Sequence, residues 1–160
     1  MEENILGAIP NVSLKKGLFK SILYNLVITD KRMIFARFRK ELIKEEAKKR
    51  AERLEEEGRG KVRQFFAKLG TGLTFYKRYF DMDPEEILKE TEGNFFIVPS
   101  NVSKIRLKKG SVSYDEDGDV GYENPHTLFI TTSSGEKLKL LFRSDFNSAR
   151  SLLSQIFGRI

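Results

Sequence analysis

The sequence contains no cysteine and a single histidine, His126, and these two shortages remove much of the common catalytic chemistry. A chain without cysteine has no disulfide, no thiolate metal ligand and no thiol nucleophile. One histidine cannot supply a multi-histidine metal site or a histidine dyad. We therefore expect a protein that is not an enzyme and that holds neither a cofactor nor a metal ion.

An acidic loop with the spacing of a calcium site lacks two residues that such a site needs. Asp115, Asp117 and Asp119 are spaced like the first ligands of an EF-hand loop. That loop requires glycine at its sixth position, where Val120 stands, and glutamate at its twelfth, where His126 stands. The sequence predicts a solvated turn here.

Long apolar runs are missing as well. No uninterrupted apolar stretch reaches the roughly 18 residues that a membrane-spanning helix needs. The chain opens with Met1, Glu2 and Glu3, whereas a secretory signal peptide opens with basic residues. We expect a protein that stays in the cytoplasm.

The composition that is present is typical of one compact domain. The 160 residues are 39% hydrophobic and 32% charged. Lysine and arginine number 29 against 23 aspartate and glutamate, which gives a net charge of +6. Anionic partners are therefore electrostatically allowed, although net charge alone does not indicate one.

Strand-forming sequence flanks a helical middle. Residues 1–39 and 93–160 contain short apolar runs separated by turns, whereas residues 40–92 have helical periodicity. We interpret residues 1–160 as a single domain whose strands are interrupted by a helical insertion over 40–92.

The strands are predicted from alternation and turn residues. In the first flank, residues 4–10 form an opening strand that Pro10 ends. A hairpin follows over 21–29 and 33–38, and the apolar residues on both of its faces predict that both faces are covered. In the second flank, we expect strands at 95–98, 102–107, 112–114, 126–132 and 137–142, with an exposed acidic loop at 115–119.

The C-terminal residues predict an amphipathic helix. Asp145 or Ser144 can cap its first turn. One stripe then carries apolar residues at helical spacing: Phe146, Ala149, Leu152, Leu153, Ile156, Phe157 and Ile160. Burial of the large residues of this stripe contributes roughly 8–15 kcal/mol before opposing terms, so we expect the helix to cover the strands.

Two segments resemble a known family. Residues 24–35, YNLVITDKRMIF, are similar to the YNLxLTDRRLIF hairpin of the prokaryotic PH-like (pleckstrin-homology-type) domains, and residues 94–105, NFFIVPSNVSKI, resemble their NFxIPYSDIxKI strand. The resemblance covers residues 1–39 and 93–160. It implies an α+β fold: a PH-like barrel of about seven antiparallel strands, capped by the C-terminal helix, with the helical insertion between strands 3 and 4. It carries no active site.

The resemblance also points to a candidate anion contact in the first hairpin. Lipid-binding members of the wider superfamily hold phosphoinositide head groups there with a Lys/Arg-x-Arg pattern. This chain has Lys15, Lys16 and Lys20 but no arginine in that stretch. Generic attraction of anions is therefore the expectation, rather than specific recognition of a phosphoinositide.

Residues 59–80 are the main candidate contact surface in the insertion. Their apolar and basic side chains share a helix that Gly70 and Gly72 weaken, so the segment needs a surface to fold upon. That surface is the barrel, a second copy or a membrane, and buried aromatics favour protein contact. The candidate contact residues are Phe65, Phe66, Leu69, Leu73, Tyr76, Phe80, Lys61, Arg63, Lys68, Lys77 and Arg78.

The rest of the insertion reads as structural. Residues 41–57 predict a solvated helix with a thin apolar stripe rather than a long coiled coil. Asp83 and Pro84 start a short helix with Ile87 and Leu88 as its apolar foot. Because this acidic segment follows the basic one, we expect the two to fold back on each other.

These observations together favour a non-catalytic binding or scaffold module. We expect protein–protein contact or self-association through the helical insertion. The alternative is peripheral binding to anionic membranes through residues 59–80, helped by the three lysines of the first hairpin. The sequence does not favour nucleic acid, because its basic residues are spread out and no aromatic platform accompanies them.

Overall fold

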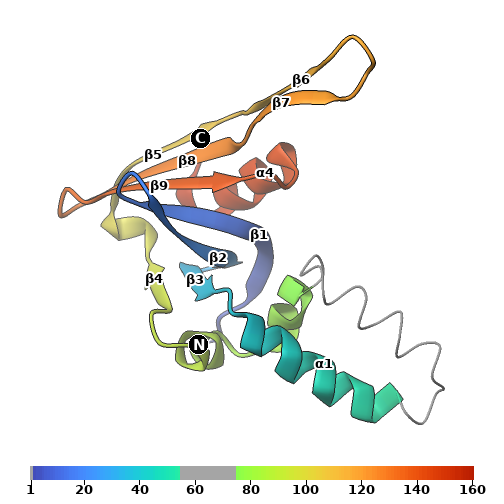
Figure 1. Cartoon of the computed structure of the whole chain (residues 1–160). Coiled ribbons are helices and arrows are strands. Elements are labelled where there is room, and N and C mark those ends of the chain that lie inside the picture. The colour runs from blue at the N-terminus through green and yellow to red at the C-terminus, as the bar shows by residue number, and fades with distance from the viewer. Residues whose placement is uncertain (1, 55–74) are drawn as a thin grey trace.

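The structure, a computed structural model, describes residues 2–54 and 75–160 (Figure 1). The chain has an α+β fold with a curved antiparallel sheet and a projecting two-stranded ribbon, and its helices lie between β3 and β4, between β4 and β5, and after the last strand. Its strands are β1 (Ile5–Lys16), β2 (Lys20–Thr29), β3 (Met33–Arg37), β4 (Phe95–Ile97), β5 (Val102–Lys108), β6 (Ser111–Tyr114), β7 (Val120–Asn124), β8 (His126–Thr132) and β9 (Lys137–Phe142). Its helices are α1 (Lys40–Leu54), η1 (Phe75–Asp81), α3 (Pro84–Glu90), η2 (Pro99–Asn101) and α4 (Phe146–Phe157).

The order of strands in the sheet explains its curvature. The seven strands run β4-β3-β2-β1-β9-β8-β5, so the two edge strands, β4 and β5, are consecutive in the chain. Strand β4 ends at Ile97 and β5 begins at Val102, and these five residue steps span at most about 18 Å. The edges of a flat seven-stranded sheet lie about 29 Å apart, so the sheet must roll toward itself.

Strand β1 does not stop at Pro10, contrary to the sequence-based expectation. It continues to Lys16 through an irregularity between Ile9 and Val12. At this point Asn11 has a φ of 53°, and its backbone N–H donates to Oδ1 of Asn25 at 3.1 Å. Proline is tolerated here because a bulge leaves the local ladder unpaired.

The concave side of the sheet holds the main core, and α4 closes it. As predicted, α4 begins after its cap Asp145, buries Ala149 and Leu153, and packs against the strands with the rest of its apolar stripe. The buried strand residues of this inner core include Tyr24, Leu26, Ile28, Met33, Phe35, Leu128, Ile130, Leu140 and Phe142.

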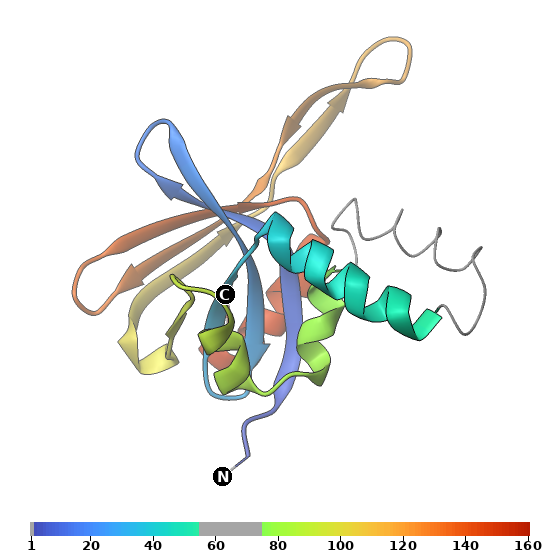
Figure 2. The same cartoon turned by 60° about the horizontal axis from the view of Figure 1, so that its bottom comes forward.

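A second, outer core lies on the opposite side of β2 and β3. Val27 and Ile34 point to this side, whereas Leu26 and Phe35 point into the inner core. The helices between β3 and β4 cover it, as seen from below in Figure 2, with Phe75, Tyr79 and Ile87 among the buried residues. The prediction that the hairpin is covered on both faces is confirmed.

The acidic loop at 115–119 is the turn of a ribbon rather than a simple loop. The expected weak strand at 112–114 is present as β6, but it pairs with β7, which the sequence reading missed. Every residue of both strands is exposed. At the base of the ribbon, a Cβ on Gly110 would lie 2.0 Å from the backbone oxygen of Asn124, so only glycine fits where the two strands converge.

Helices α1 and α3 match the sequence-based predictions over the residues that the structure describes. Helix α3 has the expected cap: Asp83 accepts from the backbone of Glu85, and Glu86 completes a capping box. Helix α1 is described to Leu54, and the predicted end of that helix lies outside the described residues. Among residues 2–54 and 75–160, no helix is long and apolar enough to cross a membrane.

Candidate binding groove

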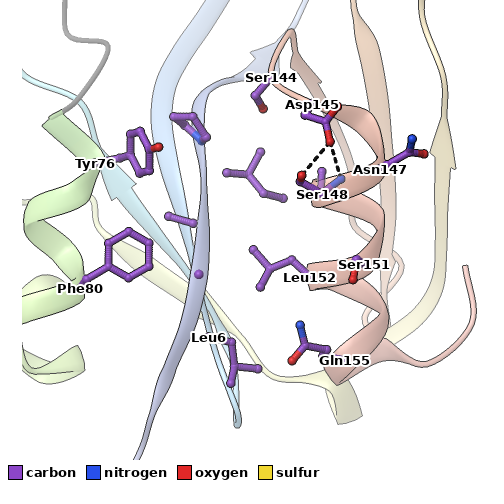
Figure 3. Close-up of a pocket in the computed structure, with 15 residues that line it drawn as sticks. Leu6, Tyr76, Phe80, Ser144, Asp145, Asn147, Ser148, Ser151, Leu152 and Gln155 are labelled. Carbon is purple, nitrogen blue, oxygen red and sulfur yellow. Dashed lines mark hydrogen bonds between the residues drawn. The ribbon is translucent and has the colours of Figure 1, made fainter.

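A groove runs along the first half of β1. It has a volume of about 750 Å³. Strand β1 supplies its floor with Leu6 to Pro10, η1 supplies one wall and α4 the other (Figure 3). Three elements that are distant in the sequence therefore meet at this groove.

The floor of the groove is a strand edge without a neighbour. Residues Ile5 to Ile9 pair with β2 on one side, whereas β9 pairs only with Ser13 and Leu14, beyond the bulge. Within the described residues, the outer edge of this half of β1 therefore meets no other strand. An open edge presents backbone N–H and C=O groups that can pair with an extended chain.

Tyr76 and Phe80 form the aromatic wall. Figure 3 shows both rings directed toward β1, and their centroids lie 6.3 Å apart. Their neighbours Phe75 and Tyr79 point the other way, into the outer core, where both are buried. Two aromatic residues of η1 therefore anchor the element, and the residue that follows each of them in the chain lines the groove.

Arg78 ties η1 to the two neighbouring helices, α1 and α3. Its guanidinium forms ion pairs with Glu46 of α1 and with Glu90 of α3. It also lies over the rings of Phe75 and Tyr79, at 5.1 and 5.4 Å from their centroids. Burial, together with the negative charge of Glu90, raises the pKa of Tyr79 well above its usual range, so its hydroxyl stays neutral.

The first turns of α4 form the polar wall. Asp145 caps the helix by accepting from the backbone N–H of Ser148 at 2.8 Å and from its hydroxyl at 2.7 Å (Figure 3). These bonds, the side-chain bond first, hold the pKa of Asp145 below its ordinary value. Hydroxyl and amide side chains of Ser144, Asn147, Ser151 and Gln155 continue the wall.

Gly7 allows α4 to approach the strand. A Cβ at this position would lie 3.0 and 3.1 Å from the two methyl carbons of Leu152. Leu152 is half-buried and forms the apolar part of the α4 wall. The absence of a side chain on Gly7 therefore sets the width of the groove.

The chemistry of the groove suits a neutral, extended ligand. Among the described residues that line it, Asp145 alone is charged, and its carboxylate is engaged in the helix cap. No lysine or arginine of the described chain lines it, so it offers no counter-charge for a phosphate. The hydroxyl of Ser148 donates to the carboxylate of Asp145 within this cap. The described residues also contain no group of three or more His, Cys, Asp or Glu placed to hold a metal.

The predicted contact residues fall into three groups. Tyr76 and Phe80 line the groove, Lys77 is exposed, and Arg78 is held in ion pairs within the chain. Lys15, Lys16 and Lys20 are exposed on a different part of the molecule, at the β1–β2 hairpin. The remaining candidates lie outside the described residues: Lys61, Arg63, Phe65, Phe66, Lys68, Leu69 and Leu73.

The sequence analysis did not identify some residues of the site. Phe75 and Tyr79, which anchor η1, were not singled out, although they have the same four-residue spacing as Tyr76 and Phe80. Nothing in the sequence signals Gly7, because its role depends on contact with a helix that lies far away in the chain. One ion pair, Arg78 with Glu90, joins the described end of the basic segment to the acidic segment; the rest of the basic segment lies outside the described residues, so the expectation that the two segments fold back on each other stays a prediction.

Comparisons with known proteins place the chain in no family. No family model and no curated protein matches it. One similar solved structure is described as the C-terminal domain of an unknown protein from Leishmania infantum, with 12% identity and a TM-score of 0.47 over 97% of this chain and 84% of that one. A similarity of that size indicates neither a family nor a function.

Proposed function

We propose that this chain is a non-catalytic protein-binding module built on a PH-like barrel, and that an extended segment of a protein partner occupies the groove. The barrel is supported by the meeting of the edge strands β4 and β5 at one corner and by the packing of α4 on the sheet. In this proposal residues 40–92 are an insertion between the third and fourth strands that supplies the aromatic wall.

The open edge of β1 is the observation that carries the proposal. An extended peptide can add to such an edge through main-chain hydrogen bonds, while pockets beside it select alternate side chains. Here the pockets are apolar next to Tyr76 and Phe80 and mixed next to Leu152 and the hydroxyls of α4. The partner segment is therefore expected to be uncharged, with apolar side chains on the η1 side.

Peptide selection followed by mapping tests the proposal. Linear peptides selected from a random library against the full chain should shift the amide resonances of Leu6, Gly7 and Ala8. Phe80→Asp should weaken their binding by about tenfold or more, because it places a charge in the apolar wall. Phe96→Asp is the matched control, since Phe96 is 45% exposed against 47% for Phe80 but lies outside the groove. Selected peptides that bind equally to both variants would contradict the proposal.

Self-association through the same groove is one form of this proposal. If a second copy supplies the segment, the full chain sediments as an oligomer and Phe80→Asp shifts it toward the monomer. Replacing residues 40–92 with a linker is a poorer test, because it exposes Val27 and Ile34 of the outer core.

The described part of residues 59–80 gives the membrane alternative little support. Phe75 and Tyr79 are buried in the outer core, and Arg78 is held by two carboxylates, so neither these two aromatics nor that cation is free to contact lipid. Lys77 and Phe80 remain exposed. The groove accounts for Phe80 without a membrane.

A further inference from the structure

Two hairpins carry most of the large apolar side chains that are exposed in the described residues. At the β1–β2 turn, Leu18 is 91% exposed and Phe19 is 100% exposed. The β6–β7 ribbon exposes Val112, Tyr114, Val120 and Tyr122. Exposed apolar clusters of this kind mark contact surfaces, whereas single exposed apolar residues do not.

The two hairpins have opposite charge. The β1–β2 hairpin carries Lys15, Lys16 and Lys20, and no acidic residue lies between them in the sequence. The turn of the ribbon carries Asp115, Glu116, Asp117 and Asp119 with no basic residue among them. Both the apolar and the charged groups of one hairpin are therefore complementary to those of the other.

The two hairpins lie too far apart to contact each other within one molecule. In both Figure 1 and Figure 2, the ribbon projects from the body of the protein and its tip lies far from the β1–β2 turn. The base of the ribbon is fixed, because Gly110 packs against the backbone at Asn124 and its N–H donates to Nδ1 of His126 at 2.8 Å. A two-stranded ribbon alone in water is only marginally stable, so contact along its faces would stabilise it.

We propose that the β6–β7 ribbon of one copy docks on the β1–β2 hairpin of a second copy. Tyr114 and the neighbouring apolar residues cover Leu18 and Phe19, and the carboxylates of the turn face the three lysines. When the contact is reciprocal, it closes a two-fold dimer; when it is one-way, it builds chains. This surface is separate from the groove, and the proposal does not depend on the function proposed above.

Charge reversal provides the test, with sedimentation of the full chain from about 1 µM to about 1 mM as the measurement. The hairpin variant is Lys15→Glu, Lys16→Glu and Lys20→Glu, and the ribbon variant is Glu116→Lys, Asp117→Lys and Asp119→Lys. Each variant alone should associate at least about tenfold more weakly than the wild type, because like charges then face each other. An equimolar mixture of the two should recover association, since both contacts of a mixed dimer again join opposite charges.

Three controls separate this contact from other causes. Lys44→Glu, Lys48→Glu and Lys49→Glu on the exposed face of α1 change the net charge as much as the hairpin variant does and should leave association unchanged. Leu18→Ser with Phe19→Ser should weaken it without any change of charge. Phe80→Asp should not affect it, so the failure of one proposal leaves the other standing.

Any of three results would overturn the proposal. The first is a wild-type chain that stays monomeric over the whole concentration range. The second is association that the mixture of variants fails to restore. The third is flotation of the wild type with phosphatidylserine vesicles that Phe19→Ser abolishes, because the β1–β2 hairpin would then be a membrane contact. Circular dichroism of each variant verifies that it is folded.

Discussion

The two sides of the β2–β3 hairpin are covered in different ways. The inner core is almost wholly apolar and is enclosed by strands of one sheet and by a single capped helix, α4. The outer core is covered by α1, η1 and α3, and ion pairs hold its rim: Arg78 with Glu46 and Glu90, and Arg32 with Glu3 and Glu85. The difference indicates that the inner core sets global stability, whereas the outer layer can open locally.

Truncation of one phenylalanine in each core is the strongest test of this difference. Phe35 is fully buried in the inner core and stacks on Phe95 at 4.2 Å, while Phe75 is 1% exposed in the outer core. Phe35→Ala should lower the free energy of unfolding by about 3–5 kcal/mol, and Phe75→Ala by less, because the layer over it can detach.

Urea unfolding and amide hydrogen exchange distinguish the two variants. After Phe75→Ala, exchange should accelerate in η1 and α3 while β8 and β9 keep their protection. Equal losses of free energy with equal acceleration throughout the chain would show that the two cores unfold as one unit.

Removal of the Arg78 charge tests the rim of the outer core. Arg78→Met keeps much of the side-chain volume but leaves Glu90 without its cation, and that carboxylate is 11% exposed. The expected loss is about 2 kcal/mol, less than for a fully buried pair because water reaches the site. Thermal unfolding measures it, with Lys77→Met as the matched control, since Lys77 is exposed and should change stability by less than about 0.5 kcal/mol.

The inner core could be predicted from the sequence more fully than the outer core. The continuous apolar runs of β2 and β3, the alternation along β9 and the stripe of α4 are local patterns, so these elements and the inner core were predictable. In η1 the pairs Phe75/Tyr79 and Tyr76/Phe80 have identical spacing. Only contact with the sheet decides which pair is buried.

Other features depend on contacts that no local pattern records. The continuation of β1 past Pro10 depends on a bulge opposite Asn25. Strand β7 has no alternation of apolar and polar residues because it is exposed on both faces. The groove exists only where β1, η1 and α4 meet, so the sequence could supply Tyr76 and Phe80 but not their partners.

Removal of a buried hydroxyl group is expected to stabilise the protein, whereas the substitutions above are expected to destabilise it. Thr91, which follows α3, is 5% exposed, and its Oγ1 has no hydrogen-bond partner in the described structure. Thr91→Val replaces that hydroxyl with a methyl group of similar size, so it should stabilise the protein by about 1 kcal/mol. Urea unfolding that shows a loss of stability would mean that Oγ1 is hydrogen-bonded in solution.

The helix cap of α4 predicts the smallest effect, and it depends on pH. Hydrogen bonds from Ser148, first from its side chain and then from its backbone, hold the pKa of Asp145 below the ordinary 3.8. The folded state therefore binds this proton more weakly than the unfolded state does. The ionised cap stabilises the fold fully at pH values above the unfolded-state pKa, and this contribution is lost as the pH falls through the lower pKa of the folded state. Asp145→Asn should thus be less stable than the wild type at neutral pH, and the difference should shrink in acid. Urea unfolding between about pH 7 and about pH 2.5 measures this, with Asp81→Asn as a control of equal charge change. A difference that stays constant across this range would mean that the carboxylate charge contributes nothing to the closure of the inner core by α4.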